Sequence, residues 1–332
     1  MNVSIIIVTY NEEQNIADCL QSLLNLDYPE KQVEILVVDG CSTDRTQDVV
    51  RGFIKRDKRI RLISNPERTI ASNRNMGIRE SRYNRIAFVD ADCIVPENWL
   101  KVLTEAFNRY VREEPNLAAV GGSNVPPQED RNRFRTALGI MLNSYLGSLG
   151  SVQGKVFHKS KTVKSLACLN VLFDRQKLVE VGMFDLEMKN LGEDAELNYR
   201  LREKGYSLMY VPGSLVYHKL RVSPGKWTVN MFRYGQGRIV MARKHPALLG
   251  FHYTLPLIFL PVFSLSLLSI RAGWFWLFPL LYFPVLFVYS LFVSIRNKKW
   301  YLVLWVFYCY LITHWSYSAG MWQKLLSGQK TM

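Results

Sequence analysis

The chain is 332 residues long, 48% of its residues are hydrophobic, and its formal net charge is +14. This length and composition are enough for one large hydrophobic core and about two domains. Residues 1–203 contain all 28 acidic side chains and 28 basic ones, whereas residues 204–332 contain 14 basic side chains and no acidic one. Because the basic part is also the apolar part, the charge favours contact with anionic lipids and a phosphorylated substrate, and it argues against nucleic acid as a partner.

Strand and helix patterns alternate along the first 90 residues. Apolar, mostly β-branched runs predict strands at residues 3–9, 33–38, 60–64 and 86–89. Helical periodicity and N-cap residues predict helices after the first strand, from about residue 44 to 56, and near residues 70–81. This alternation predicts an α/β, Rossmann-like fold with a mostly parallel sheet and helices on both faces. Ligands bind such sheets beyond the carboxyl ends of the strands, where Tyr10, Asp39 and Asp92 are expected.

Two carboxylates follow the fourth predicted strand. Asp90 and Asp92 are one residue apart, and residues so spaced on an extended backbone face the same side. Together they are suited to bind one hard cation and, through it, phosphate oxygens. A solvated turn after the strand is the alternative interpretation. A buried strand end with two carboxylates is costly without a compensating cation or hydrogen bonds, which favours the metal site.

The elements further along the chain include one segment with two interpretations. A helix is predicted from Pro96 to about residue 113, and strands at residues 117–121 and 207–211. Residues 134–150 form an amphipathic pattern behind basic residues that include Arg133 and Arg135. This pattern is typical of a helix in a membrane interface, and also of an ordinary packing helix.

A second acidic pair, Glu193 and Asp194, lies in or just before the first turn of a predicted helix that ends at Gly205. A helix N-terminus favours anions, so the pair is either a helix cap or the source of a general base that activates a hydroxyl group. A metal at Asp92 and a base at Asp194 would together complete a displacement mechanism. Downstream, His218 is either a further metal or phosphate contact or a surface histidine.

The C-terminal part combines a basic segment with long apolar ones. The basic segment, residues 229–250, contains Arg233 and Arg238, which either contact phosphate oxygens or face lipid headgroups. Three segments without charged side chains follow, each roughly the 20 residues needed to cross a membrane, at residues 251–270, 274–295 and 300–320. The positive-inside rule then predicts a multi-pass protein of the cell membrane whose N-terminal part faces the cytoplasm. Five scattered cysteines and the lack of a secretory signal in the first ten residues agree with this expectation.

Five motifs occur in the order found in one enzyme family. They are residues 8–12 (VTYNE), 38–44 (VDGCSTD), 90–92 (DAD), 192–194 (GED) and 234–238 (YGQGR). The chain thereby resembles the inverting glycosyltransferases of family 2, which have the GT-A fold, and among them the membrane-anchored enzymes of the succinoglycan glucosyltransferase type. The resemblance covers about residues 1–250. It implies a cytoplasmic GT-A domain at residues 1–228, with residues 134–150 as a candidate interfacial helix.

The resemblance also implies a role for each matching residue. The nucleotide-sugar donor, commonly a UDP-sugar, would be held by Thr9, Tyr10, Glu12, Asp39, Arg74, Asn75, Asp90 and Arg238. Asp92 would coordinate Mg²⁺ or Mn²⁺ on the diphosphate, with His218 as a further contact. Asp194 would be the catalytic base, with Glu193 beside it.

Departures from the family patterns favour one acceptor class. The Gln-x-x-Arg-Trp element of processive synthases is absent because Ile239 follows Arg238, so transfer of a single sugar is favoured. Residues 68–82 do not supply the glycine-rich segment of polyprenyl-phosphate sugar synthases, so a lipid-diphosphate-linked saccharide is the preferred acceptor and bare polyprenyl phosphate the alternative. A non-catalytic membrane subunit that binds nucleotide is a third reading, and both acid pairs argue against it.

Overall fold

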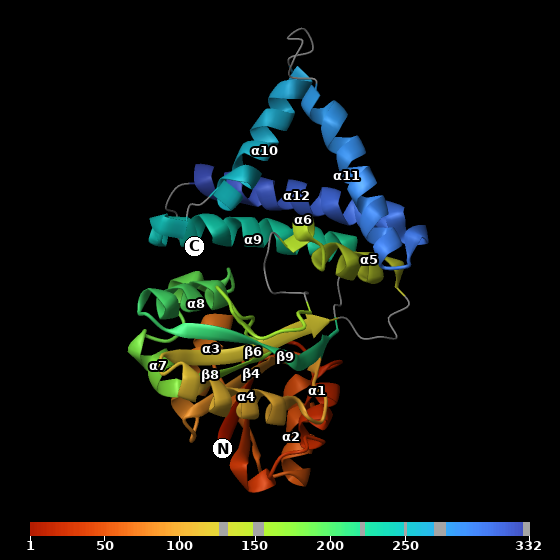
Figure 1. Cartoon of the computed structure of the whole chain (residues 1–332). Helices are drawn as coiled ribbons and strands as arrows, with labels where there is room; N and C mark the ends of the chain where they lie inside the picture. Colours follow the sequence, from red (N-terminus) through yellow and green to blue (C-terminus); the bar gives the residue numbers. More distant parts are fainter. Residues whose placement is uncertain (126–131, 149–155, 220–222, 249–250, 269–276, 328–332) are drawn as a thin grey trace. The chain divides into compact units, whose positions relative to one another are not determined.

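The computed structural model describes residues 1–125, 132–148, 156–219, 223–248, 251–268 and 277–327. The chain divides into two compact units, which Figure 1 shows in the colours of the sequence. Unit 1 comprises Met1–Pro127 and Ser151–Leu220, and unit 2 comprises Gln128–Gly150 and Arg221–Met332. Parts of the predicted interfacial helix, basic segment and first two apolar segments lie outside the described residues, at 149–150, 249–250 and 269–276.

Unit 1 is built on one β-sheet. Its strands are β1 (Val3–Thr9), β2 (Val33–Asp39), β3 (Ile60–Ser64), β4 (Arg85–Asp90), β5 (Cys93–Ile94), β6 (Leu117–Val125), β7 (Lys161–Thr162), β8 (Val171–Asp174) and β9 (Ser207–His218). Their order is β3-β2-β1-β4-β8-β6-β9-β5, and β7 pairs with β9. The first four strands are parallel, as predicted, and Thr9 pairs with Asp39 while Val8 pairs with Asp90. Their carboxyl ends therefore lie at one edge of the sheet.

The sheet is mixed, because antiparallel strands join the parallel ones that the sequence predicted. Strand β8 lies between β4 and β6 and runs antiparallel to both. Strand β9 pairs in parallel with β6, but β5 and β7 run antiparallel to β9. Strand β8 has only four residues, all buried, and the sequence gives it neither an alternating pattern nor a nearby partner. A strand of this kind is recognised only through its pairing, which is non-local.

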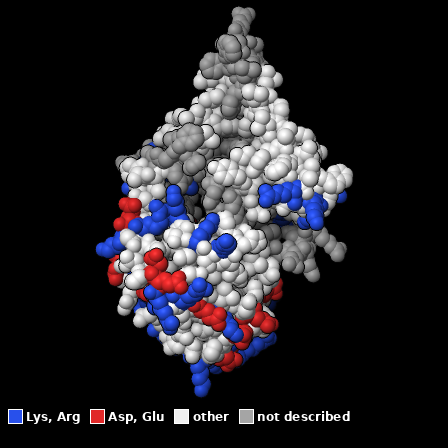
Figure 2. Space-filling model, in the orientation of Figure 1, with Lys and Arg blue, Asp and Glu red and all other residues white. Residues whose placement is uncertain are grey.

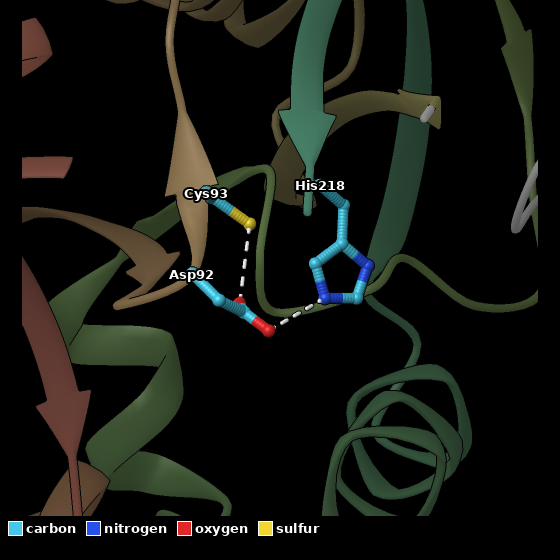
Figure 3. A group of neighbouring side chains, drawn as sticks. All are labelled: Asp92, Cys93 and His218. Carbon is cyan, nitrogen blue, oxygen red and sulfur yellow. Dashed lines mark hydrogen bonds and ion pairs between the residues drawn. The ribbon is translucent and has the colours of Figure 1, made fainter. Parts of the chain in front are cut away.

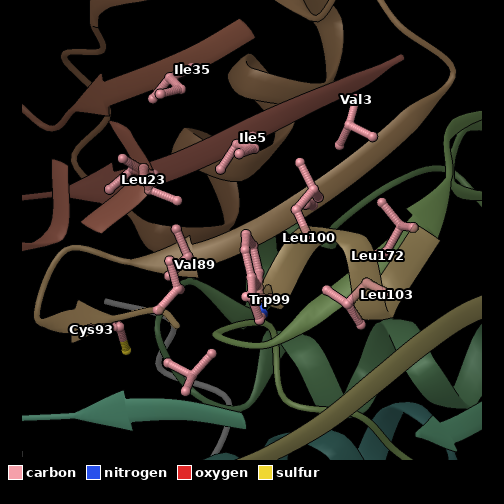
Figure 4. Close-up of a cluster of buried hydrophobic side chains, with 14 of the residues drawn as sticks. Val3, Ile5, Leu23, Ile35, Val89, Cys93, Trp99, Leu100, Leu103 and Leu172 are labelled. Atoms are coloured by element: carbon pink, nitrogen blue, oxygen red, sulfur yellow. The ribbon is translucent and has the colours of Figure 1, made fainter. Parts of the chain in front are cut away.

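Helices cover both faces of this sheet, as predicted. They are α1 (Ile16–Leu24), α2 (Thr46–Arg56), α3 (Ile70–Glu80), α4 (Trp99–Glu113), α7 (Arg175–Glu180) and α8 (Glu193–Glu203), with 3-10 turns η1 (Glu30–Gln32) and η2 (Leu186–Met188). Alternate residues of β1 face opposite sides: Ile5 and Ile7 pack with α1, α2 and α4, and Ile6 packs with α3, α7 and α8. Figure 4 shows part of the first cluster, in which Trp99 and Leu103 of α4 pack near Val89 of β4.

Unit 2 consists of helices. They are α5 (Arg133–Leu142), α6 (Tyr145–Ser148), α9 (Pro224–Lys244), α10 (Phe251–Leu268), α11 (Leu277–Arg296) and α12 (Val303–Leu326), with 3-10 turns η3 (Pro246–Leu248) and η4 (Trp300–Leu302). The three predicted apolar segments thus coincide with helices. Among the residues that the structure describes, no helix reaches both the length and the hydropathy that crossing a membrane would take.

Close contacts inside unit 2 involve the predicted amphipathic segment and a glycine of α9. The amphipathic segment forms α5 and α6, and apolar side chains of α5, such as Phe134 and Leu138, are buried, with the Phe134 ring against that of Trp305. Gly235 and Gly237 lie inside the continuous helix α9. A Cβ on Gly235 would lie 2.1 Å from the carbonyl oxygen of Tyr317. Glycine is needed there for close packing of α9 against α12.

Candidate active site

The loops after β1 and β2 are joined by hydrogen bonds at the carboxyl edge of the sheet. The backbone N–H of Asn11 donates to Ser42 Oγ (2.9 Å), and Asn11 Oδ1 accepts from the N–H of Thr43 (2.8 Å). The N–H of Glu12 donates to Thr46 Oγ1 (2.8 Å). Asn11 adopts a positive φ of 54°, which Asn tolerates better than most residues. The two motifs assigned to the nucleoside therefore form one rigid edge.

The side chains on this edge differ in how accessible they are. Tyr10 is 46% exposed, whereas Thr9 and Asp39 are buried. The Asp39 carboxylate accepts hydrogen bonds from the N–H of Ser42 (2.8 Å) and from Gln47 Nε2 (2.6 Å). Asp39 thus holds its own loop against α2, whereas the side chain of Tyr10 is exposed. Glu12 accepts a hydrogen bond from Asn15 Nδ2 (2.6 Å).

The two carboxylates of the Asp-x-Asp motif contact different partners. Strand β4 ends at Asp90, and Ala91 and Asp92 form a turn before β5. The sequence predicted that both carboxylates lie on one extended backbone and face the same side. This prediction is wrong, because Ala91 and Asp92 form a turn. Asp90 faces Arg74, and Asp92 faces His218. The turn allows two adjacent carboxylates to serve two different contacts.

Arg74 on α3 bridges the first and the second acidic pair. Its Nη1 donates to Glu193 Oε1 (2.7 Å), and its Nη2 lies 3.3 Å from Asp90 Oδ1. Arg74 and Glu193 are only 5% and 6% exposed. The Arg74 guanidinium also lies over the rings of Phe88 and Phe184, 5.9 Å and 5.3 Å from their centroids. Burial raises the pKa of Glu193 and of Asp90, and the Arg74 charge opposes this rise.

Asp92, Cys93 and His218 form a cluster of potential metal ligands, shown in Figure 3. His218 Nε2 lies 3.0 Å from Asp92 Oδ2, and Cys93 Sγ lies 3.8 Å from Asp92 Oδ1. The cluster is assembled by the sheet, because Cys93 on β5 pairs directly with His218 at the end of β9. Burial opposes the charge on both groups, but their hydrogen bond and mutual attraction lower the pKa of Asp92 and raise that of His218.

The cluster fits a divalent cation. An octahedral ion with bonds of about 2.1 Å holds neighbouring ligand atoms about 3.0 Å apart. The observed distance between His218 Nε2 and Asp92 Oδ2 is 3.0 Å. His218 Nδ1 is buried and has no hydrogen-bond partner among the described residues. Carboxylate and imidazole are common ligands of Mn²⁺ and related ions, so Asp92 and His218 can serve as two ligands of one cation.

The second acidic pair begins helix α8. Gly192, at the N-cap, has a φ of 85°, a left-handed conformation that favours glycine. Asp194 follows Glu193 in the first turn and is partly exposed, with Oδ1 accepting a hydrogen bond from the N–H of Ala195 (2.7 Å). Of the two carboxylates, Asp194 is accessible to a substrate, whereas Glu193 is buried against Arg74.

Comparisons with known proteins agree with this architecture. The model of "Glycosyl transferase family 2" matches residues 4–162, and that of "Glycosyl transferase family group 2" matches residues 85–322, more than half of the chain. The chain belongs to glycosyltransferase family 2. It is therefore an enzyme, as the sequence motifs predicted.

Several named proteins are similar to this glycosyltransferase. A dolichyl N-acetyl-alpha-D-glucosaminyl phosphate 3-beta-D-2,3-diacetamido-2,3-dideoxy-beta-D-glucuronosyltransferase of Methanococcus voltae is 28% identical over 73% of this chain and 74% of that protein. The succinoglycan biosynthesis protein ExoA of Rhizobium meliloti is 26% identical over 97% of this chain and 95% of its own. The solved mannosyltransferase PcManGT from Pyrobaculum calidifontis, in complex with GDP-Man and Mn²⁺, has a TM-score of 0.64 at 19% identity, covering 95% and 87% of the two chains. The last comparison confirms a GT-A-like fold.

Two predicted donor-binding residues of the glycosyltransferase have contacts elsewhere. The Asn75 side chain is buried and makes two hydrogen bonds with the backbone of Phe184, donating to its carbonyl (2.7 Å) and accepting from its N–H (2.8 Å). It fixes the loop that carries Phe184 beneath Arg74. Arg238 belongs to unit 2, where its Nε donates to Tyr317 Oη (3.0 Å).

Sequence reasoning about the glycosyltransferase missed Cys93. An extended backbone would turn residue 93 away from the side that Asp92 faces, and five scattered cysteines suggested ordinary reduced thiols. The turn at residues 91–92 brings the thiol back beside the carboxylate. The signal in the sequence was the position of Cys93 directly after the Asp-x-Asp motif.

Proposed function

We propose that this glycosyltransferase moves a single sugar, with inversion, from a nucleotide-sugar, most simply a UDP-sugar, to a lipid-linked saccharide at the cytoplasmic face of the membrane. The observation that carries the proposal is the Asp92–His218 pair, 3.0 Å apart, at the end of the sheet where β4 leads into β5. The solved relative PcManGT binds a nucleotide-sugar with Mn²⁺. The Methanococcus relative is named for a dolichyl-linked acceptor.

The residues divide the proposed reaction between them. Asp92 and His218 would hold Mg²⁺ or Mn²⁺, which neutralises charge on the departing diphosphate when bound. Asp194 takes the proton of the acceptor hydroxyl as its oxygen bonds to the anomeric carbon, while the bond from that carbon to the diphosphate oxygen breaks. Arg74 keeps Glu193 and Asp90 in place and balances their charge. Tyr10, with its exposed ring, is positioned at the edge assigned to the nucleoside.

Two variants test this division of roles. In assays with UDP-sugars and a polyprenyl-diphosphate-linked saccharide, we expect Asp194→Asn to abolish transfer while UDP still binds in the presence of Mn²⁺. We expect Asp92→Asn to abolish both transfer and the metal dependence of UDP binding. Asp48→Asn, which changes an exposed carboxylate paired with Arg51 on α2, is the matched control and should transfer normally. Full transfer by the Asp194 variant would refute its assignment as the base.

The acceptor and the stereochemistry need separate measurements. Proton NMR of the product should show an anomeric configuration opposite to that of the donor, and retention would contradict the single displacement. Transfer to bare polyprenyl phosphate, with none to the diphosphate-linked saccharide, would favour the alternative acceptor class.

The membrane part of the proposal is supported by the surface of unit 2. One face of α11 is apolar and more than half exposed over most of its length, and it carries Leu281, Val285, Val288, Phe292 and Ile295. The small polar residues Ser290 and Ser294 of the same helix are fully buried. Exposed aliphatic and buried small polar side chains are typical of helices that face lipid.

Charge also distinguishes the two units. Figure 2 shows acidic and basic side chains mixed over the part of the surface that belongs to unit 1. The described residues of unit 2 include no acidic side chain. Helix α11 ends at Arg296, and Lys298 and Lys299 follow it closely. A basic end on an apolar helix favours binding to anionic lipid headgroups.

Vesicle flotation tests the membrane proposal. We expect the full chain to float with vesicles that contain phosphatidylglycerol, and Val285→Glu combined with Val288→Glu to reduce the floating fraction strongly. Val179→Glu changes a similarly exposed valine (53%, against 61% and 63%) on α7 of unit 1 and is the control. Equal flotation of the α11 variant and the control would contradict the proposal. Protease access in inverted vesicles, but not in intact cells, would support the cytoplasmic orientation.

A further inference from the structure

Cys93 contributes a third kind of donor atom to the cation cluster. It is 1% exposed and lies on β5, and its strand partner in the antiparallel pair is His218. Ligand atoms from Asp92, Cys93 and His218 all lie within 4.8 Å of one another. The cluster therefore brings sulfur and nitrogen atoms together at the Asp92 carboxylate, as Figure 3 shows.

The sulfur–oxygen distance in the cluster is close to the one expected around a tetrahedral ion bound through sulfur. A zinc ion with bonds of about 2.3 Å to sulfur and about 2.1 Å to oxygen separates those two atoms by about 3.6 Å. The Cys93 Sγ to Asp92 Oδ1 distance is 3.8 Å. The corresponding separation between nitrogen and oxygen is about 3.4 Å. His218 Nε2 and Asp92 Oδ2 are 3.0 Å apart, so small side-chain rotations are enough to close the site.

We propose that Asp92, Cys93 and His218 form a site for thiophilic divalent cations, binding Zn²⁺ and Co²⁺ through the Cys93 sulfur more tightly than it binds Mg²⁺ or Mn²⁺. This inference rests on the proposed function, because the same site would hold the cation that serves the donor. When the ion binds, the Cys93 S–H proton passes to the buffer and a sulfur–metal bond forms, with no change of oxidation state. Three protein ligands leave one position open, as in catalytic zinc sites.

The chemistry of the donor atoms sets the order of affinities. Oxygen ligands suit Mg²⁺ and Mn²⁺, whereas thiolate selects Zn²⁺ and similar softer ions. A site with carboxylate and imidazole ligands alone would bind divalent metals in their general order of affinity. A sulfur ligand strengthens the preference for zinc over manganese. Zn²⁺ should therefore displace Mn²⁺ from the wild-type protein and do so less effectively when Cys93 is replaced.

Cobalt spectroscopy on the full chain tests the inference directly. Co²⁺ bound to a thiolate gives a sulfur-to-metal charge-transfer band in the near ultraviolet, and we expect this band in the wild-type protein and its loss in Cys93→Ser. Cys19→Ser is the matched control, because Cys19 is equally buried, with its thiol 3.6 Å from the carbonyl oxygen of Asp90, but outside the cluster. The control should keep the band. A second readout is the release of bound Mn²⁺ by Zn²⁺ in the wild-type protein, followed by electron paramagnetic resonance.

Each outcome decides one of the two proposals. Bound Co²⁺ without a charge-transfer band in the wild type, or a band that survives in Cys93→Ser, overturns the sulfur ligand whatever the variant's stability. Failure of Zn²⁺ to displace Mn²⁺ overturns it too. Sugar transfer that depends on Mn²⁺ would then persist, leaving the proposed function intact. A cobalt band that depends on Cys93, with no transfer from any nucleotide-sugar, would instead support the cation site and remove the proposed function.

Discussion

The Arg74 bridge provides the sharpest test of how unit 1 tolerates its buried acids. Replacing Arg74 by methionine leaves the Glu193 carboxylate, which is 6% exposed, without its cation. At an effective dielectric constant of about 20, charges 2.7 Å apart attract each other by about 6 kcal/mol. Desolvation offsets part of this attraction, and breaking such a buried pair costs about 3–5 kcal/mol. We therefore expect Arg74→Met to lower the free energy of unfolding of unit 1 by about 3–5 kcal/mol.

This loss of stability should depend on pH and on the charge of Glu193. Burial raises the pKa of Glu193, and without Arg74 it should rise further, so protonation at low pH relieves the unpaired charge. The difference in stability between variant and wild type should then shrink as the pH falls through the raised pKa of Glu193 and grow above it. Adding Glu193→Gln to the Arg74 variant should recover much of the loss, because no buried charge remains at position 193.

Hydrogen–deuterium exchange of the peptides that contain β1 and β4 measures this free energy for unit 1 alone. Arg51→Gln, on the exposed pair with Asp48, is the control and should change it by less than about 1 kcal/mol. A loss below about 1 kcal/mol for Arg74→Met, a loss that does not vary with pH, or a double variant no more stable than the single one would show that Arg74 does not compensate a buried charge on Glu193.

Close packing at two glycines and the protonation of His218 can be tested in the same way. Gly77→Ala puts a Cβ 2.5 Å from Cγ2 of Ile6 and should cost unit 1 about 1–3 kcal/mol, whereas Gly52→Ala, in open space on α2, should stabilise it by up to about 1 kcal/mol in the same exchange assay. Gly320→Ala, whose Cβ would lie 1.9 Å from the Phe232 carbonyl oxygen, should lower exchange protection in α9 and α12. Mn²⁺ affinity should rise with pH, because the cation must displace the proton of His218. Burial lowers the pKa of His218, but Asp92 raises it overall. His218→Gln should weaken this pH dependence in a titration followed by electron paramagnetic resonance.

The first half of the sheet could be predicted because its information is local. Residues 3–9 and 33–38 are mostly β-branched runs, and each is followed by helix signals, so both the strands and their parallel order follow from neighbouring residues. Strand β8 could not be predicted in this way, since its four residues pair with β4 and β6, which lie 45 or more residues earlier in the chain. Local patterns say little about such pairings.

The sequence indicated some residues of the candidate site, but it did not indicate the hydrogen bonds that they make. Asp92 and His218 do meet, as a shared role in metal binding implied. Asp39, by contrast, accepts hydrogen bonds from its own loop, and Asn75 bonds to the distant backbone of Phe184, which a motif cannot reveal. Cys93 joins Asp92 only because a turn interrupts the strand. Motifs identify which residues converge, whereas the hydrogen bonds that each one makes depend on the folded backbone.

We propose that Asp92 holds a divalent cation against the diphosphate of the donor. Anomalous diffraction from crystals soaked with UDP and Mn²⁺ locates that cation. We expect a manganese peak at bonding distance from the Asp92 carboxylate and from a diphosphate oxygen. Bound UDP with the manganese peak elsewhere, or with none at all, would contradict it.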